Sequence, residues 1–390
     1  MRTLTLKLAA AALAFAAGGA QADITVGINL GTTGPGAAIG IPTKDTVLLW
    51  PRKLGDQIAH YVLLDDASDV TAAVRNARKF VDELKVDVVV GPNITPNALA
   101  VQEVAAAAQT PMLALAASAS IVEPQDEPKR QWSFKLPQND SLMAGALARY
   151  MAQTGIKTVG FIGFADAYGA SWWNTFSAAA QAAGLQIVAD ERYQRNDTSV
   201  TGQALKLISA RPDAVLVAGS GAPAVLPQKT LVERGYAGKI FQTHGIASPQ
   251  YLQIGGKDVE GTVFPTGPVV VARELPADHP VREVAVQFVE QYEAKYGQGT
   301  STQFAGDAWG AWIMLDNAVR RAMRFGKVEP GTPAFRQALR DALEQTENLT
   351  VPNGVLNLSP QDHQGFDERA VVMGVVRDGK FSYLDEAPKP

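Results

Sequence analysis

Hydrophobic and polar residues alternate with two different periods along the first half of the chain. Short apolar runs, typical of buried strands, lie at residues 24–30, 61–64, 86–90 and 112–116. Apolar positions with helical spacing lie between these runs, at residues 43–54, 70–84 and 98–108. Strands that alternate with helices across short turns are typical of a parallel sheet covered by helices on both faces.

The alternation begins again near residue 140. Helices are predicted at residues 142–153, 171–183, 199–210 and 222–234, and strands at 158–163, 186–189, 214–218 and 239–242. Thr198 or Ser199 is expected to cap the helix at 199–210 through its hydroxyl. The run at residues 86–91 resembles the run at 212–219, and each precedes a turn and a helix. This repetition predicts two similar α/β lobes.

The last third of the chain differs from this pattern. After an apolar run at residues 263–271, longer helices are predicted at 280–295, 302–324 and 333–344. The tail is predicted to be rich in strands, with those at 371–376 and 381–384 flanking a turn at Asp378-Gly379.

The length of the chain also favours two lobes, because a single core stops growing at about 250–300 residues. No low-complexity linker separates the halves, so we expect several short crossings that allow the lobes to hinge about a cleft. We assign residues 23–139 and 267–350 to the first lobe, and residues 140–266 and 351–390 to the second.

The first 22 residues have the pattern of a secretory signal peptide. Arg2 and Lys7 precede an unbroken apolar run at residues 8–17. Ala20-Gln21-Ala22 then has the small residues that signal peptidase recognises. The apolar run is too short to span a bilayer, which takes about 20 residues. We therefore expect cleavage after Ala22 and a mature chain that works outside the cytoplasm.

Charge and cysteine content exclude several classes of function. Without the two basic residues of the leader, 33 basic and 39 acidic residues remain, a net charge of −6. This acidity disfavours nucleic acid and anionic membranes as partners, because both require a clustered basic face. The chain has no cysteine, which excludes cysteine nucleophiles, iron–sulfur clusters, thiolate zinc sites and a lipid anchor on cysteine.

Two glycine-rich turns follow predicted strands. The turn at residues 31–36, which includes Thr33, lacks both the Gly-Lys-Ser/Thr ending of a nucleotide-binding loop and the dinucleotide fingerprint. It is either a turn whose backbone N–H groups face a ligand cleft or an ordinary tight turn. Gly219-Ser220-Gly221 lacks the spacing of a hydrolase elbow, so we expect Ser220 to face a cleft as a polar residue rather than to act as a nucleophile.

The histidines and aromatic residues offer binding candidates rather than a catalytic set. Neither metal-ligand spacing nor a cluster of acids accompanies any of the four histidines, His60, His244, His279 and His363. His244 follows a predicted strand, so it is either at the edge of a cleft or a structural histidine. Tyr168 opens a helix where its ring can stack on a ligand, whereas at least one of Trp172 and Trp173 is expected to pack that helix on its sheet.

Short motifs also occur in a fixed order along the whole mature chain. They are residues 31–35, Asp65-Asp66, 90–92 with Thr95, 111–118, 166–169, Glu260-Gly261 and 359–365. Together they resemble the leucine/isoleucine/valine-binding family of periplasmic solute receptors for ABC transporters. The resemblance implies the type I periplasmic binding protein fold, in which two similar lobes, each a mostly parallel sheet flanked by helices, are joined by hinge crossings. It also implies a periplasmic monomer without cofactor or metal, which presents its ligand to a permease in the inner membrane.

The resemblance implies a set of ligand contacts. In that family, hydroxyl and backbone N–H groups of the first lobe hold the carboxylate of the ligand, and the matching positions here are Thr95, Ala116 and Ser118. Neutral donors suit a carboxylate that must be released again, since each contributes one charge-assisted hydrogen bond. The aromatic wall of the second lobe matches Tyr168.

Two departures from the family bear on the choice of ligand. The acid that holds the ammonium of an amino acid aligns with His244, and an unpaired buried ammonium costs roughly several kcal/mol. Two aromatic residues of the family align with Ile39 in the first lobe and Ser220 in the second. These changes favour an aromatic or branched carboxylate over an α-amino acid.

We therefore expect a solute receptor of an ABC importer that binds a small carboxylate and catalyses no reaction. A receptor for branched-chain or other amino acids is the alternative within the same class. An exported hydrolase that uses Ser220 or His244, and a sensory or scaffolding module that binds a protein, are alternatives from other classes. The expected ligand-binding residues are Thr33, Ile39, Thr95, Ala116, Ser118, Tyr168, Ser220 and His244.

Overall fold

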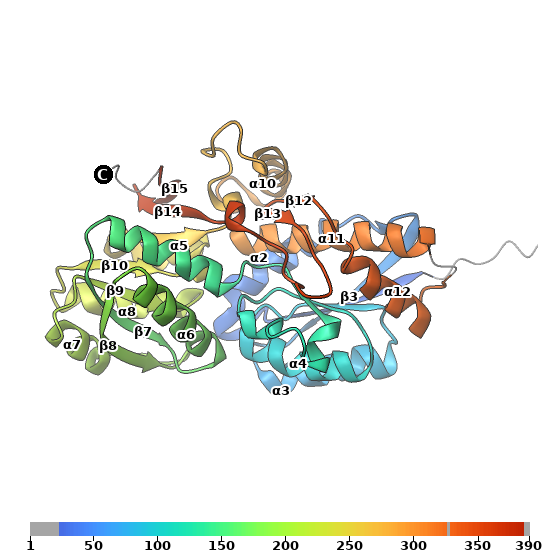
Figure 1. The fold of residues 1–390 in the computed structure, drawn as a ribbon, viewed down its shortest axis with the longest axis horizontal. Coiled ribbons are helices and arrows are strands. Elements are labelled where there is room, and N and C mark those ends of the chain that lie inside the picture. Colours follow the sequence, from blue (N-terminus) through green and yellow to red (C-terminus); the bar gives the residue numbers. More distant parts are fainter. Residues whose placement is uncertain (1–22, 326–327, 386–390) are drawn as a thin grey trace, which may run out of the picture.

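Two lobes lie side by side along the longest axis of the molecule (Figure 1). The structure is a computed structural model that describes residues 23–325 and 328–385. The predicted signal peptide lies outside the described residues. Within the described ranges, no helix is both long and apolar enough to cross a membrane.

The first lobe is built on a six-stranded sheet with the order β2-β3-β1-β4-β5-β6. Neighbouring strands are parallel except for β2, which pairs antiparallel with β3 at the edge. The strands are β1 (Ile24–Leu30), β2 (Lys53–Leu54), β3 (Gln57–Asp65), β4 (Val88–Val90), β5 (Met112–Ala114) and β6 (Ser133–Lys135).

Helices cover both faces of this sheet because its strands bury side chains on both sides. Ile24, Val26 and Ile28 of β1 face a core that also contains side chains from two of the long C-terminal helices. On the opposite face, Asn29 Nδ2 donates a hydrogen bond to the carbonyl oxygen of Ala73. The first face is covered by α2 (Ala37–Val47), α11 (Gln303–Phe325) and α12 (Pro333–Leu343), and the second by α3 (Val70–Arg78) and α4 (Thr95–Ala107).

The second lobe is built on a seven-stranded sheet with the order β15-β14-β11-β10-β9-β7-β8. The five strands from β11 to β8 are parallel, and β14 and β15 add an antiparallel hairpin at one edge. The strands are β7 (Thr158–Phe164), β8 (Gln186–Tyr193), β9 (Ala214–Ala218), β10 (Lys239–Gln242), β11 (Val263–Thr266), β14 (Val372–Arg377) and β15 (Lys380–Tyr383).

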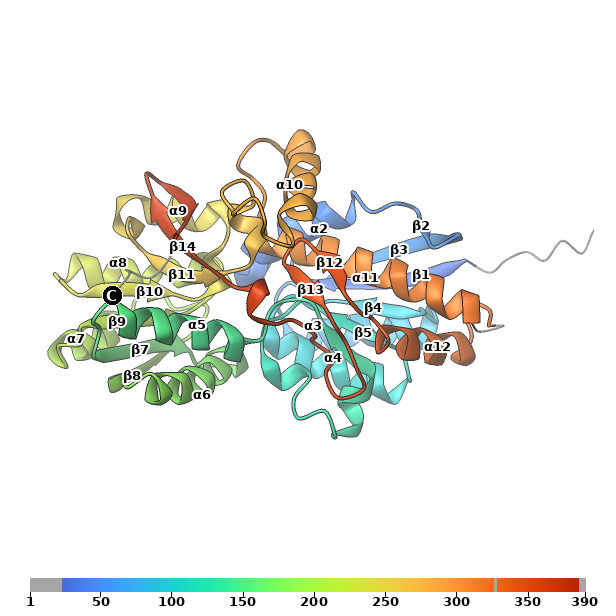
Figure 2. The same ribbon diagram turned by 45° about the horizontal axis from the view of Figure 1, so that its top comes forward.

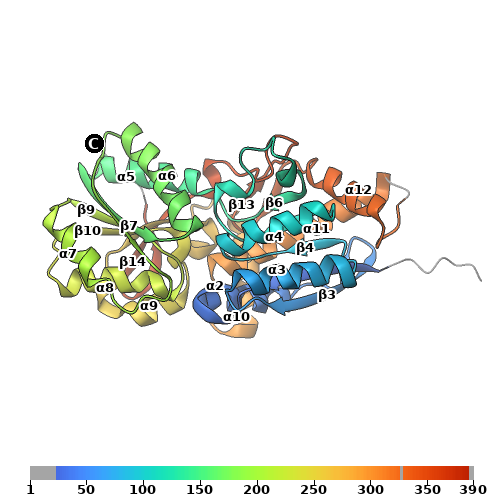
Figure 3. The same ribbon diagram turned by 90° about the horizontal axis from the view of Figure 1, so that it is seen from below.

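Two layers of helices enclose this second sheet, as the view from below shows (Figure 3). One layer consists of α5 (Asp140–Gln153) and α6 (Ala167–Ala182), and the other of α7 (Thr201–Ser209), α8 (Val225–Glu233) and α9 (Pro249–Gly255). The doubly covered parallel sheets confirm the fold class expected from the alternating pattern.

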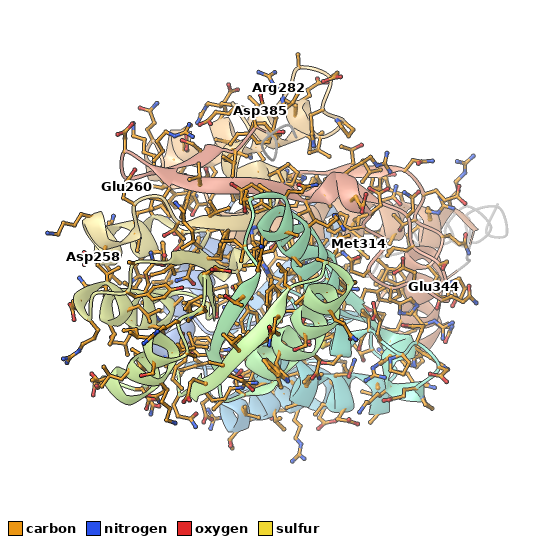
Figure 4. The ribbon with its side chains drawn as sticks, turned by 60° about the vertical axis from the view of Figure 1, so that its left-hand side comes forward. Asp258, Glu260, Arg282, Met314, Glu344 and Asp385 are labelled. Atoms are coloured by element: carbon orange, nitrogen blue, oxygen red, sulfur yellow. The ribbon has the colours of Figure 1, made fainter. Side chains whose placement is uncertain are left out.

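The C-terminal hairpin has the turn that its sequence predicts. Asp378 and Gly379 both have positive φ, 51° and 69°, as a two-residue hairpin turn requires. The carboxylate of Glu260 accepts hydrogen bonds from the backbone N–H groups of both turn residues, at 2.8 and 3.2 Å. Glu260 lies beside the end of the red strand β14 in Figure 4, so the hairpin is tied to the rest of the second sheet.

The chain crosses between the lobes three times, between β6 and α5, between β11 and α10 (Arg282–Tyr296), and before β14. The third crossing is the red segment that runs from one lobe to the other in Figure 2. Gln138, in the first crossing, donates through Nε2 to the carbonyl oxygens of Asn353 and Ala370, and its Oε1 accepts from Gln303 Nε2. Gln303 Oε1 in turn accepts from Thr266 Oγ1 in the second crossing. These buried hydrogen bonds join the three crossings into one hinge.

The sequence predicts a lobe boundary at residue 350, but the third crossing lies later in the chain. A small antiparallel pair, β12 (Leu349–Val351) and β13 (Gly354–Leu356), precedes it. Val351, Leu356 and Leu358 belong to the core of the first lobe, and Phe366 packs against that core. The segment from 351 to 366 therefore packs with the first lobe, and the strands β14 and β15 belong to the second.

Two local predictions are wrong. The helix expected at 43–54 is α2, which begins at Ala37 and contains Pro42, while Lys53–Leu54 is the edge strand β2. The run of small residues before Pro42 hides the helical period in the sequence. Helix α7 begins at Thr201, and its N-cap residue is Val200, which offers no capping group, rather than Thr198 or Ser199. Ser199 Oγ still accepts a long hydrogen bond, 3.4 Å, from the backbone N–H of Thr201.

Candidate functional site

A small cavity lies between the two lobes. Its walls come from segments that follow the carboxyl ends of parallel strands in both sheets, which is where open α/β sheets bind ligands. The lining residues are Ile39, Asn93, Ile94, Thr95, Leu115, Ala117, Pro137, Tyr168, Arg195, Ser220, His244, Gly245, Phe304 and Asp307.

The segment after β4 brings two hydrogen-bond donors to the wall of the first lobe. Gly91 has a φ of 92°, and a Cβ atom there would lie 2.1 Å from the carbonyl oxygen of Asn29, so the turn requires glycine. Asn93 Oδ1 accepts from the backbone N–H of Gly31 at 2.8 Å, which fixes the orientation of the amide. Among the described residues, neither Asn93 Nδ2 nor Thr95 Oγ1 has a hydrogen-bond partner, although both side chains are buried.

A guanidinium group lies in the wall of the second lobe. Arg195 follows β8, and its guanidinium carbon lies 4.1 Å from the centre of the Phe164 ring. Its Nε donates to Asp166 Oδ2 at 2.6 Å and its Nη1 to Ser220 Oγ at 3.1 Å. Asp166 also caps α6 by accepting from the backbone N–H of Tyr168. A permanently charged group is therefore held in place at the cavity.

His244 and Tyr168 lie deeper in the same wall. The hydroxyl of Tyr168 and Thr243 Oγ1 are 2.8 Å apart, and burial raises the pKa of Tyr168. His244 is 2% exposed, with its ring centre 5.7 Å from that of Trp172. Burial, with a smaller effect from the charge of Lys135, lowers the pKa of His244 to about 3, so its ring is neutral. Its Nδ1 has no partner within residues 23–325 and 328–385.

Helix α11 adds an acid and an aromatic ring from the first lobe. Phe304 packs with Ile39 and Ile94 as a small apolar cluster in the wall. Asp307, 3% exposed, accepts a hydrogen bond at Oδ1 from Asn353 Nδ2 at 2.6 Å. Its Oδ2 is buried without a partner in the described part of the chain. Burial raises the pKa of Asp307 to about 7, opposed by the Asn353 hydrogen bond and by the charge of Lys135.

Five of the eight residues expected at the site line this one cavity: Ile39, Thr95, Tyr168, Ser220 and His244. They come from both lobes and from segments more than 200 residues apart in sequence, so the fold brings them together. Their contact with a ligand stays a prediction.

The other three expected residues lie outside the lining. Thr33 is at the surface, where its hydroxyl donates to Asp65 Oδ2 at 2.7 Å. Ala116 packs in the core between the first sheet and the α3–α4 layer. Ser118 Oγ donates to Ser171 Oγ at 2.7 Å, which joins the first lobe to α6 of the second. Ser118 therefore makes a contact between lobes in this conformation.

Sequence reasoning missed Asn93, Arg195, Phe304 and Asp307. Arg195 lies in a polar stretch, residues 194–197, that has the composition of a surface loop. Asp307 carries a better signal, because it is a single acid in the otherwise uncharged stretch 301–315 of a long helix. A lone acid in a buried helical stretch indicates either a structural hydrogen bond or a site.

A family model described as periplasmic binding protein matches residues 23–380. The chain belongs to this family. The family resemblance expected from the sequence motifs is thereby confirmed. Periplasmic binding proteins of this type are solute receptors of ABC transporters rather than enzymes.

Known relatives agree with this assignment. The periplasmic binding protein is 28% identical over 262 residues to Leu/Ile/Val-binding protein homolog 3 of Brucella melitensis, which covers 65% of this chain and 70% of the relative. It is 44% identical to an extracellular ligand-binding receptor from Rhodopseudomonas palustris HaA2, with a TM-score of 0.89 over 93% of this chain and all of that one.

A more distant structure shares only the fold with this periplasmic binding protein. It is the solute-binding protein of an R. palustris ABC transporter in complex with benzoate, 21% identical, with a TM-score of 0.80 over 94% of this chain and 99% of the other.

No group of three or more acidic or histidine side chains that could hold a metal ion occurs within the described ranges.

Proposed function

We propose that the chain is a periplasmic receptor that binds a small carboxylate in the cavity between its lobes and delivers it to an ABC permease. The observation that carries the proposal is the convergence of three donors on one buried cavity. Arg195 supplies a positive charge from the second lobe, and Thr95 Oγ1 and Asn93 Nδ2 supply unpartnered donors from the first. Buried donors without partners are costly unless a bound group satisfies them.

The same donors couple binding to closure of the lobes. A carboxylate that accepts hydrogen bonds from both walls has its full set of contacts only in the closed form, so it shifts the hinge equilibrium toward that form. Helix α4 begins at Thr95, so the positive end of its dipole lies at the same wall and favours an anion. A closed and loaded receptor is the form that a permease needs to distinguish from the empty one.

The apolar part of the lining supports an aromatic or branched ligand. Ile39, Ile94, Phe304, Leu115 and Tyr168 surround the polar groups with aliphatic and aromatic surface. The benzoate complex of the distant structural relative is an example of an aromatic carboxylate on this fold. Neutral His244 offers no charge to an ammonium, which supports carboxylates over amino acids.

A receptor for amino acids is the second candidate. Relatives named for leucine, isoleucine and valine favour it, and so does the acid Asp307 in the lining. An ammonium next to the carboxylate of Asp307 would take the place of the contact that the family makes from the position of His244.

The decisive experiment uses mature protein that has been unfolded and refolded to remove any bound ligand. Aromatic carboxylates, branched carboxylates and amino acids are then compared by thermal shift and calorimetry. A ligand at 100 times its Kd stabilises the folded state by about 2.7 kcal/mol, so binding is readily detected. Mass spectrometry of the protein before refolding identifies what it carries from the cell. Absence of a shift with every carboxylate and amino acid would remove the proposal.

Export and oligomeric state belong to the same proposal. We infer that the leader is removed after Ala22 and that the mature receptor is a periplasmic monomer. N-terminal sequencing of protein from a periplasmic extract should begin at Asp23, and light scattering should give the mass of one chain. A retained leader or a cytoplasmic location would contradict export.

A further inference from the structure

We propose that Asp307 determines specificity by accepting, at its free Oδ2, a hydrogen bond from a hydroxyl or amine group of the ligand. The receptor then selects carboxylates that carry a second, donating group over carboxylates that lack one. This inference rests on the proposed function, because it concerns the ligand of the same cavity.

The first support is the way in which Asp307 is held. Asn353 Nδ2 donates to Oδ1 at 2.6 Å, and the same amide nitrogen lies 3.3 Å from the carbonyl oxygen of Gln303. The carbonyl oxygen of Asn353 accepts from Gln138 Nε2 in the first crossing. The carboxyl group is therefore fixed by the hinge hydrogen bonds, and it cannot turn Oδ1 toward a ligand without breaking them.

The second support is the environment of the remaining oxygen. Oδ2 is buried and has no partner among the residues that the structure describes, and Asp307 lines the cavity. A buried carboxyl oxygen without a donor is costly. The cavity is the place from which a donor can reach it, so the missing partner is a group on the ligand.

The third support is the distribution of charge around the cavity. Lys135, fully buried on β6, is the charge that acts on both Asp307 and His244, but its Nζ donates to the carbonyl oxygens of Ala117 and Pro137. Lys135 therefore does not complete the hydrogen bonds of Asp307. Arg195 on the second lobe attracts a carboxylate, whereas Asp307 on the first lobe attracts a donor, so the two walls suit a ligand with both groups.

The test compares ligand pairs that differ only in the donor. For a hydroxyl, 4-hydroxybenzoate is compared with benzoate and 4-hydroxyphenylacetate with phenylacetate; for an amine, L-leucine is compared with 4-methylpentanoate. We expect the donor-bearing member of at least one pair to bind about ten- to a hundredfold more tightly, the range for a hydrogen bond to a charged group. The pair that shows the preference identifies the hydroxyl or the amine as the source.

The variant Asp307→Asn keeps the size of the side chain and an oxygen for Asn353. We expect the preference to fall below about threefold in this variant, because its amide nitrogen takes the place of Oδ2. The matched control is Asp87→Asn, which alters a buried carboxylate of the same lobe outside the cavity, where it accepts from the backbone N–H groups of Thr25 and Gly331. This control should keep the full preference.

A measurement on the unaltered protein covers the case in which Asp307→Asn does not fold. Calorimetry at pH 7 in two buffers of different ionisation enthalpy gives the protons exchanged on binding. Burial also lowers the pKa of Lys135 to about 7, so Lys135 exchanges protons when any carboxylate binds. The difference between the two members of a ligand pair therefore reports Asp307. An acceptor role requires an ionised Asp307 in the complex, so the donor-bearing ligand should release more protons, or take up fewer, than its partner without the donor. Equal exchange, or a greater uptake with the donor-bearing ligand, would overturn the inference.

The remaining outcomes separate this inference from the proposed function. Tight binding of carboxylates with equal affinity for both members of every pair would overturn the role of Asp307 and leave the carboxylate receptor in place. No binding of any carboxylate or amino acid would overturn both. A preference that survives in Asp307→Asn would place the acceptor elsewhere in the cavity and would also overturn the inference.

Discussion

Single side chains in the cavity have pKa values that differ from their ordinary values, because both lobes exclude water from them. His244 is the clearest case, since its ring is buried against Trp172 and within reach of the charge of Lys135. A free histidine is partly protonated near neutral pH, but this one stays neutral down to acid pH. At the residue scale, burial rather than residue type decides that His244 carries no charge at neutral pH.

The pKa of His244 predicts how the stability of the protein depends on pH. Because the pKa is lowered from 6.5 to about 3, the unfolded chain binds a proton between these values and the folded chain does not. The stabilisation by neutral His244 is present above pH 6.5 and is lost as the pH falls toward 3. We expect His244→Gln to lose less stability than the wild type between pH 7 and pH 4, by up to about 3 kcal/mol.

Urea denaturation at pH 7, 5.5 and 4 measures this difference. The control is His60→Gln, because His60 is 58% exposed in its side chain. Parallel losses of stability in the wild type and His244→Gln would show that His244 is accessible to protons in the folded protein.

Arg195 is predicted to contribute to the affinity for a carboxylate. Its guanidinium reaches Asp166 and Ser220 and lines the cavity. We expect Arg195→Gln to weaken carboxylate binding by at least about tenfold, since a charge-assisted hydrogen bond contributes about 1.5–3 kcal/mol. Arg195→Lys should recover part of the affinity because it keeps the charge.

Arg192 provides the matched control for this experiment. It lies on β8, the strand that precedes Arg195, and stacks on Phe161 and Trp173 outside the cavity lining. Arg192→Gln should leave the Kd of the carboxylate within about twofold. If both arginine variants lose affinity equally, the effect is one of lobe stability rather than of ligand contact.

At the scale of elements, the segment after β5 and the start of α6 meet across the cleft through Ser118 and Ser171. The sequence motif places Ser118 at a ligand contact, whereas the structure places its hydroxyl on the opposing lobe. This hydroxyl pair joins the two lobes across the cleft, so it stabilises the conformation in which the lobes are in contact. Ser118 then affects affinity through the hinge equilibrium, because ligand binding draws on the population of the closed form.

A double-mutant cycle separates the two roles of Ser118. If the hydroxyl pair stabilises closure, Ser118→Ala and Ser171→Ala should weaken binding by similar factors, about two- to fivefold. Both variants remove the hydrogen bond between Ser118 and Ser171, although Ser118 Oγ also lies 2.7 Å from Ser120 Oγ. The loss in the double variant should therefore be smaller than the product of the two single losses. Calorimetry with one carboxylate measures all four proteins. A large loss in Ser118→Ala with none in Ser171→Ala would return Ser118 to the ligand.

Most strands of the two large sheets follow directly from the sequence, because many buried strands are apolar runs bounded by glycine or proline, whereas the short strands β2, β6, β12 and β13 have no such signal. The strands at 24–30, 214–218 and 239–242 have the predicted bounds. The start of α2 does not follow, because small residues around Pro42 give no period. Only part of the cavity lining could be predicted, for a related reason. Thr95, Ser220 and His244 follow strands at turns that the sequence shows. Arg195 in a loop and Asp307 inside a helix reach the cavity only through tertiary packing.

For the whole molecule, the three crossings form the part that both lobes share. Gln138, Gln303 and Asn353 are buried there, and their amides satisfy one another and the backbone of the crossings. A network of this kind has little tolerance for a missing member, because each lost group leaves others without a partner. The same network orients Asp307, so the conformation of the hinge and the polarity of the cavity are coupled.

Gln138→Leu tests this coupling, since leucine keeps the bulk of glutamine but neither donates nor accepts. It leaves the carbonyl oxygens of Asn353 and Ala370 without their donor and Gln303 Nε2 without its acceptor. We expect a loss of about 2–4 kcal/mol in the free energy of unfolding, which urea denaturation measures. Gln337→Leu, on the exposed face of α12, removes a surface hydrogen bond to Asp341 and should change it by less than about 0.5 kcal/mol. Small-angle scattering adds a readout that a merely local defect would not move: with a saturating carboxylate, the wild type should contract on binding, and Gln138→Leu should contract less at equal occupancy. Equal contraction of both proteins would mean that the glutamine network stabilises the crossings without controlling how the lobes close.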